Sequence, residues 1–258
     1  MRVVLFTSEE PLYLPPYIQP ILAAYGDAVD RLVVAPFDAP LRRQVREYLG
    51  MYGVRAGARM GLSYLGASAL GALPRSVTRR MTGRHYSVAG VARAHDVPVE
   101  RVPDVSDPGF VDRMRALDPE VLLSVVAGQR LPPALLDCAT EALNLHGSLL
   151  PNYRGRATAF WPLYYGDDRT GVTAHRMTDR FDAGPVIERR AFPIEDDDTV
   201  DSVYRKLSAT GAALAVDLLD AYPELPEPTP NETTKADYHG VPDASERRTF
   251  RERGGEFL

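Results

Sequence analysis

The chain has a single cysteine, Cys138, among its 258 residues. One cysteine can form neither an internal disulfide nor a thiolate metal cluster, which indicates a protein of a reducing compartment. Most residues near Cys138 in the sequence are apolar, so we expect an inert core residue in preference to a nucleophile.

Long apolar runs are also missing. No stretch reaches the roughly 20 uninterrupted apolar residues that a membrane-spanning helix needs. The best candidate, residues 54–73, is broken by Arg55, Arg59 and four glycines. The N-terminus has only a short apolar run before Ser8 and lacks the long apolar centre of a signal peptide. We therefore expect a cytoplasmic protein without a membrane partner.

Basic residues are not in excess over the chain as a whole. Thirty Lys and Arg against 35 Asp and Glu give a formal net charge of -5 and a pI of about 5.6. Such a balance does not favour binding to nucleic acid or to an anionic membrane. No G-x-G-x-x-G pattern follows the first apolar run, so NAD is not expected either.

Acidic residues are absent from one segment, residues 48–95, which is rich in arginine. Its arginines are Arg55, Arg59, Arg75, Arg79, Arg80, Arg84 and Arg93. Helical spacing of apolar residues occurs twice: at Leu41, Val45, Tyr48, Leu49 and Tyr52, and at Met60, Leu62, Tyr64 and Leu65. We interpret residues 38–86 as a helical insertion. It serves either as a solvated flap or homodimer contact, or as a docking element for a phosphorylated substrate or carrier.

Short β-branched apolar runs alternate with helical patterns along the chain. The expected strands are residues 3–8, 31–36, 99–102, 121–127, 142–146, 171–177 and 185–192. The expected helices are residues 17–25, 88–95, 107–117, 132–138 and 200–222. This alternation predicts an α/β fold with a doubly wound, mostly parallel sheet. Residues 121–127 lack polar alternation, as expected for a strand at the sheet centre.

The chain divides into two expected parts. Residues 1–196 are predicted to form the core, with the helical insertion inside it. Residues 197–258 are predicted to form a C-terminal helix, capped by Asp198 or Thr199, and an extended tail. The stretch PELPEPTPNET after Pro223 has the composition of a linker.

Polar residues follow two of the expected strands. Asn144 and His146 end the strand at 142–146, and Asp182 follows the strand at 171–177. Ligands of open α/β sheets bind beyond the carboxyl ends of the strands, so these three side chains are candidates for one site. Singly, each also has an ordinary explanation: an asparagine that caps backbone groups, a hydrogen-bonded core histidine, and a turn-forming aspartate.

The stretch from Asn144 to Gly184 resembles the 10-formyltetrahydrofolate-dependent formyltransferases. The matching motifs are Asn-x-His at 144–146, Ser-Leu-Leu-Pro-x-Tyr-Arg-Gly at 148–155, Thr-Gly-Val-Thr-x-His at 170–175 and Asp-x-Gly at 182–184. The resemblance is dense over residues 100–195 and diffuse elsewhere. It implies a Rossmann-like core, N-formyltransferase activity, 10-formyltetrahydrofolate as co-substrate, and no metal.

The resemblance implies a role for each of the three polar residues. Formyl transfer to an amine passes through a tetrahedral oxyanion, which the Asn144 amide would stabilise. His146 would take the proton of the attacking amine and pass it to the departing folate nitrogen. Asp182 would orient the imidazole, raise its basicity and order a proton-carrying water. For His175, which lies in the middle of a strand, we expect a structural role.

Binding residues follow from the same resemblance. The pterin is expected between two loops, formed by Gln129, Arg130 and Leu131 and by Asp179, Arg180 and Phe181. The acceptor is expected at Ser148, Pro151, Tyr153, Arg154 and Arg156, with a cis peptide bond before Pro151. Arg154 and Arg156 either grip an anionic acceptor or are simply solvated.

The identity of the amine is left open by these motifs. Only 35 residues follow Pro223, too few for the barrel with which the methionyl-tRNA enzyme of this family binds tRNA. The purine-pathway member lacks an arginine-rich insertion. We therefore expect a small-molecule acceptor, first a nucleotide-linked amino sugar and otherwise a natural-product amine. The alternatives are a formyltetrahydrofolate hydrolase, a transferase acting on glycinamide ribonucleotide or methionyl-tRNA, and a folate-binding module without catalysis.

Overall fold

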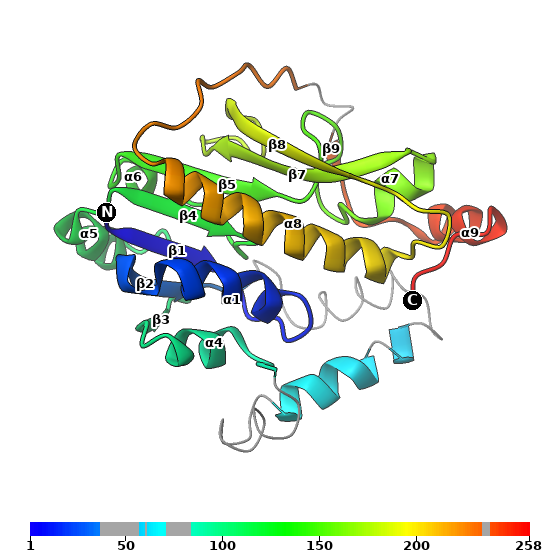
Figure 1. The fold of residues 1–258 in the computed structure, drawn as a ribbon, viewed down its shortest axis with the longest axis horizontal. Helices are drawn as coiled ribbons and strands as arrows, with labels where there is room; N and C mark the ends of the chain where they lie inside the picture. The colour runs from blue at the N-terminus through cyan, green and yellow to red at the C-terminus, as the bar shows by residue number, and fades with distance from the viewer. Residues whose placement is uncertain (37–56, 60, 71–83, 234–237) are drawn as a thin grey trace.

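The computed structural model describes residues 1–36, 57–59, 61–70, 84–233 and 238–258 (Figure 1). Its centre is a seven-stranded sheet of order β3-β2-β1-β4-β5-β7-β8. The strands are Val3–Thr7 (β1), Val29–Val34 (β2), Val99–Arg101 (β3), Val121–Val125 (β4), Glu141–His146 (β5), Arg169–Arg176 (β7) and Val186–Pro193 (β8). The strands from β3 to β5 pair in parallel, whereas β7 is antiparallel to both β5 and β8. The predicted mostly parallel α/β sheet is confirmed.

Helices cover both faces of the sheet (Figure 1). They are Leu14–Tyr25 (α1), Val88–Ala94 (α4), Pro108–Leu117 (α5), Pro133–Leu136 (α6), Phe160–Tyr165 (α7), Val200–Ala221 (α8) and Ala244–Glu252 (α9), with a 3-10 turn at Gly26–Ala28. Buried residues of α1, α4 and α8 belong to one hydrophobic cluster, and those of α5 and α6 belong to a second. Every helix and strand predicted at the positions given above is therefore present, within a few residues at each end.

Local chemistry explains where the main elements begin. Thr199 caps α8, because its side chain accepts from the Ser202 N–H and the Ser202 side chain accepts from the Thr199 N–H. Asp107 caps α5 by accepting from the Phe110 N–H. β4 is buried along its whole length, as its unbroken apolar sequence predicts.

The last part of the chain is packed against the core. Thr229 pairs with Val186 beside β8, and Tyr238–His239 (β9) pairs in parallel with Arg154–Gly155 (β6). Phe250 and Phe257 join the hydrophobic cluster of α1 and α8. The segment after Pro223, whose composition is that of a linker, is therefore anchored to the core at several points. Its composition alone did not predict this anchoring.

Part of the expected helical insertion is described. Residues 57–59 and 61–70 are helical, which agrees with the predicted pattern at Leu62, Tyr64 and Leu65. The pattern at 41–52, Met60 and four of the arginines (Arg55, Arg75, Arg79 and Arg80) lie outside the described residues. No helix in the part of the chain that the structure describes is long and apolar enough to cross a membrane. Cys138 is buried, and burial raises the pKa of its thiol, consistent with an inert core residue.

Candidate active site

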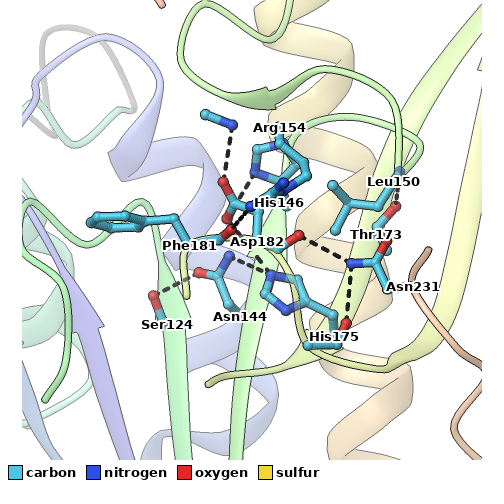
Figure 2. A network of polar contacts seen from close by, with 12 residues as sticks. Ser124, Asn144, His146, Leu150, Arg154, Thr173, His175, Phe181, Asp182 and Asn231 are labelled. Atoms are coloured by element: carbon cyan, nitrogen blue, oxygen red, sulfur yellow. Dashed lines mark hydrogen bonds and ion pairs between the residues drawn. The ribbon is translucent and has the colours of Figure 1, made fainter. Parts of the chain in front are cut away.

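The end of β5 carries the two strand residues of the candidate site. Asn144 and His146 are two positions apart on the strand, so their side chains point to the same face of the sheet. Asp182 comes from the loop between β7 and β8. Figure 2 shows the three side chains converging from these two places. The structure thus brings together the three residues that the motifs single out.

His146 and Asp182 form a close pair. The distance between His146 Nδ1 and Asp182 Oδ1 is 3.4 Å, and His146 Nε2 lies 3.0 Å from the carbonyl oxygen of Tyr153. A carbonyl oxygen only accepts hydrogen bonds, so Nε2 carries a proton and donates it. Nδ1 is then the ring nitrogen that faces the carboxylate.

The charge of Asp182 is stabilised by its surroundings. Burial by itself would raise the pKa of Asp182, but the positive charge of His146 in its protonated form and the Gly155 N–H outweigh it and hold that pKa well below its usual range. The Gly155 N–H donates to Asp182 Oδ2 at 3.0 Å. Asp182 is therefore a carboxylate that is mostly buried and ionised.

Asn144 is oriented from both sides. Its Oδ1 accepts from the Ser124 hydroxyl at 2.8 Å, and its Nδ2 lies 3.1 Å from His175 Nε2. His175 Nδ1 donates to the Arg176 carbonyl at 2.9 Å, so Nε2 is the acceptor for the amide. An amide has two N–H donors, and Asn144 lines the cavity described below, which makes its second donor suitable for a ligand oxygen.

The expectation of a structural role for His175 is refined by this geometry. His175 is buried, and its Nε2 lies 3.8 Å from Asp182 Oδ1 as well as next to the Asn144 amide. The ring therefore connects two of the three predicted residues (Figure 2). His175 comes close to the Asn144 amide because the register of β5 and β7 sets the two residues opposite each other.

A cavity of about 520 Å³ opens beside these side chains. Asn144, His146, His175 and Asp182 all line it. Its volume is within the roughly 300–1,000 Å³ that is usual for small-molecule sites. Residues from both ends of the chain also line it, with Glu10 from the N-terminal part and Tyr238 from the C-terminal part.

One wall consists of the two loops expected to hold the pterin. Gln129, Arg130, Leu131, Arg180 and Phe181 line the cavity. Asp179, also a described residue, does not line it, and its carbonyl accepts from Arg130 Nη1 at 2.5 Å. The side chain of Gln129 accepts from the Val105 N–H and donates to the Pro103 carbonyl. This wall therefore offers apolar surface, arginine stems and backbone groups to a ligand.

The loop expected to grip the acceptor has a different arrangement from the one predicted. Arg156 lines the cavity, whereas Ser148, Pro151, Tyr153 and Arg154, all described residues, do not. Ser148 is buried and donates to the Asn152 carbonyl. The Tyr153 hydroxyl donates to Asp167. Arg154 is buried and donates from Nη2 to the Phe181 carbonyl at 2.6 Å, which ties this loop to the loop of Asp182.

The same loop is fixed by backbone contacts. The expected cis peptide bond between Leu150 and Pro151 is present. The Leu150 N–H donates to the Thr173 hydroxyl, which donates in turn to the Ser148 carbonyl. Tyr153 and Gly155 contribute a carbonyl to His146 and an N–H to Asp182. The loop therefore acts on the site mainly by holding the two catalytic candidates.

Several residues at the site were not predicted from the sequence, among them Asn231, Tyr238 and Glu10. Asn231 donates from Nδ2 to the carbonyls of Asp182 and Gly184, at 3.0 and 3.1 Å. Tyr238 and Glu10 line the cavity. The carboxylate of Glu10 accepts from the N–H groups that begin α1, and burial raises its pKa. No local motif marks these residues, because each reaches the site through a long-range contact.

The described residues contain no group of three or more His, Cys, Asp or Glu side chains that could hold a metal ion. The polar side chains gathered around the end of β5 are an amide, two imidazoles and a carboxylate. Such a set can donate to a developing oxyanion and move a proton.

Comparison with known proteins gives consistent matches. The family described as "Formyl transferase" matches residues 82–219. A methionyl-tRNA formyltransferase of Thermosynechococcus vestitus is 36% identical over 174 residues, which cover 66% of this chain and 52% of that protein. The chain thus spans about half the length of this relative.

Solved structures share the fold. A sugar N-formyltransferase from a Shewanella species aligns with a TM-score of 0.59 and 19% identity, over 93% of this chain and 77% of that one. The N-formyltransferase of Helicobacter canadensis, in complex with folinic acid and dTDP-3-aminofucose, aligns with a TM-score of 0.58 and 16% identity, over 93% and 71%. At these identities the likeness concerns the fold.

Proposed function

The chain belongs to the formyl transferase family, and from this premise we propose that it transfers a formyl group from 10-formyltetrahydrofolate to a primary amine of a small acceptor. The observation that carries the proposal is the cluster of Asn144, His146, His175 and Asp182 on the wall of one cavity. 10-Formyltetrahydrofolate supplies the formyl carbon. The apolar surface that Val126, Ala127, Leu131, Met177 and Phe181 give to one wall suits a flat pterin ring.

Asn144 stabilises the negative charge that develops on the formyl oxygen. One of its N–H groups is directed by His175, and Ser124 fixes the orientation of the amide. The second N–H is the donor to the oxygen. Because both neighbours hold the amide in place before the reaction, this donor needs little reorganisation, which is the condition for effective oxyanion stabilisation.

His146 and Asp182 move the proton. The amine nitrogen forms a bond to the formyl carbon and gives its proton to Nδ1 of His146, either directly or through a water. Asp182 next to Nδ1 stabilises the imidazolium that results. The proton then goes to the folate nitrogen as its bond to the formyl carbon breaks. The products are the N-formylated acceptor and tetrahydrofolate.

Glu10 bears on the class of acceptor. The N-terminus of a helix is a usual site for a phosphate group, but the N–H groups of Leu12, Tyr13 and Leu14 at the start of α1 already bind the Glu10 carboxylate. This end of the cavity therefore favours amino or hydroxyl groups over a phosphate. A nucleotide-linked amino sugar whose sugar enters first fits this condition, and glycinamide ribonucleotide bound with its phosphate at α1 does not.

Three alternatives to transfer onto an amino sugar remain. The match to a methionyl-tRNA formyltransferase favours methionyl-tRNA as a second acceptor. A hydrolase would use water in place of the amine and would need the same oxyanion donor and the same base. A natural-product amine would be used in the same way as an amino sugar.

A mass-spectrometric assay separates these reactions. The protein is incubated with 10-formyltetrahydrofolate and a panel of amines that includes dTDP-3-aminofucose, glycinamide ribonucleotide and methionyl-tRNA. We expect a gain of one CO unit on the amino sugar. Formate release at an equal rate without any amine would identify a hydrolase, and a gain only on methionyl-tRNA would replace the small acceptor.

A further inference from the structure

The C-terminal segment returns to the cavity after leaving α8. β9 pairs with β6 so that Tyr238 lies opposite Arg154 and His239 lies opposite Gly155. The Arg156 N–H donates to the His239 carbonyl at 2.9 Å, and Trp161 Nε1 donates to the Gly240 carbonyl at 3.1 Å. Backbone contacts therefore hold this segment beside the loop that supports His146 and Asp182.

The ring of Tyr238 lies on the surface of Gly155. A Cβ atom at Gly155 would come within 2.5 Å of the His239 carbonyl oxygen and 3.0 Å of the Tyr238 ring, and Gly155 has a φ of 96°. A glycine is thus required for β9 to approach this closely. The ring lines the cavity together with Gly155 and Arg156, and 50% of Tyr238 remains exposed.

Half-exposed aromatic surface on the wall of a catalytic cavity suggests contact with a ligand. β9 is held by its backbone, by Trp161 Nε1 and by the His239 ring, which packs on an aromatic group that includes Trp161. None of these contacts uses the Tyr238 side chain. It lies on Gly155, next in the chain to Arg156, which is the residue of the expected acceptor loop that lines the cavity. The face of a tyrosine ring attracts the C–H groups of a sugar ring and stacks on a nucleobase.

We infer that Tyr238 is a specificity-determining residue, whose ring stacks on a ring of the amine acceptor, either the hexose or the base of a nucleotide-linked sugar. This inference rests on the proposed function and adds to it a subsite on the C-terminal segment. It predicts that the acceptor, and not the folate, depends on Tyr238. A linear amine without a ring gains nothing from this subsite.

Steady-state kinetics of the full chain test the inference. The probes are dTDP-3-aminofucose and free 3-aminofucose, each with 10-formyltetrahydrofolate. We expect Y238A to raise the acceptor KM about tenfold, and Y238F, which keeps the ring, to change it less than about twofold. The KM for 10-formyltetrahydrofolate is expected to stay the same in both variants. Tyr165 provides the matched control. It is 55% exposed and stacks on Tyr153, but it is not one of the described residues that line the cavity.

The two probes separate the two kinds of ring. An effect of Y238A on both probes assigns the hexose, and an effect on the nucleotide-linked sugar alone assigns the base. An acceptor KM that is unchanged in Y238A, or raised equally in Y165A, would overturn the inference while wild-type transfer still supports the proposed function. Absence of transfer by the wild-type protein to every amine of the panel would overturn the proposed function, and the inference with it.

Discussion

At the scale of single residues, the site depends on how a few polar groups are held. Asn144 and His146 project from one strand end, and each has neighbours that fix which atom faces the cavity. Ser124 and His175 orient the amide, and the Tyr153 carbonyl leaves Nδ1 of His146 facing Asp182. The chemistry proposed for each side chain follows from these partners.

Replacement of His146 by alanine is expected to lower kcat for formyl transfer by about 10²–10⁴-fold, because the proton of the amine then has no acceptor. Binding of 10-formyltetrahydrofolate, measured by titration calorimetry, should persist, since the pterin wall is untouched. His95, which pairs with Gln19 away from the cavity, provides the control variant H95A. Near-full activity of H146A would remove His146 from the proposed mechanism.

The lowered pKa of Asp182 predicts how the stability of the protein varies with pH. A carboxyl group whose pKa is lower in the folded state contributes stability above its unfolded pKa of about 4, and that contribution is lost as the pH falls towards the folded pKa. D182N lacks the contribution at every pH. The Tm difference between wild type and D182N should therefore be largest near pH 6 and shrink below about pH 4.

Calorimetric scans at a series of pH values check this trend. The variant D217N provides the control, because Asp217 is exposed and its ion pair with Arg190 at 2.7 Å lies on the surface, where such pairs contribute little. A Tm difference for D182N that does not change with pH would contradict the stabilised carboxylate.

At the scale of elements, the loop of Asp182 is held between two segments. Arg154 of β6 donates to the carbonyl of Phe181 on one side, and Asn231 of the C-terminal segment donates to Asp182 and Gly184 on the other (Figure 2). The loop is therefore positioned by parts of the chain that do not belong to the β7–β8 hairpin. Asn231 acts as a positioning residue for Asp182.

N231A is expected to lower kcat about tenfold, because two hydrogen bonds of roughly 1 kcal/mol each hold the loop. The acceptor and folate KM values should change much less, since Asn231 does not touch either proposed ligand. T229A is the matched control, because Thr229 lies in the same C-terminal segment as Asn231. The substitution removes the hydrogen bond from the Thr229 hydroxyl to the Val186 carbonyl and keeps the backbone pairing of the two residues. Equal losses of kcat in both variants would indicate general loosening of the segment.

At the scale of the whole molecule, the core and the cavity share their supports. α8 packs beside α1 on one face of the sheet (Figure 1), and its residues belong to the same hydrophobic cluster as Phe250 and Phe257 of the C-terminal segment. Glu10 at the start of α1 and Tyr238 of β9 line one cavity. Stability of this core therefore determines whether the site assembles at all.

L214A tests that dependence on the core. Leu214 is fully buried on α8, and its truncation is expected to cost about 2–5 kcal/mol of unfolding free energy. Urea denaturation followed by circular dichroism measures the change. V216A, which truncates a half-buried residue of the same helix, should cost clearly less. A similar loss in both variants would argue against α8 as a central packing element.

The sequence by itself determined the sheet and its helices, and it predicted three residues that lie together at the candidate site. Alternation of apolar runs with helical patterns needs only local periodicity, and Asn144 and His146 end a strand at the edge of the sheet where ligands bind. Asp182 follows β7, which is antiparallel to β5, so its place beside them was predicted by the Asp-x-Gly motif and not by the rule of strand ends. The cis bond before Pro151 was implied by a motif of eight residues, Ser148 to Gly155. Each of these features is encoded within a short stretch of the chain.

Only the tertiary structure decided which other residues reach the site and which do not. Arg154 was expected to bind the acceptor, but the path of the chain buries it against Phe181. Asn231 reaches Asp182 across 49 residues of sequence, and Glu10 and Tyr238 approach the cavity from opposite ends of the chain. Such contacts depend on how distant segments pack, and packing energy has no periodic signature in the sequence.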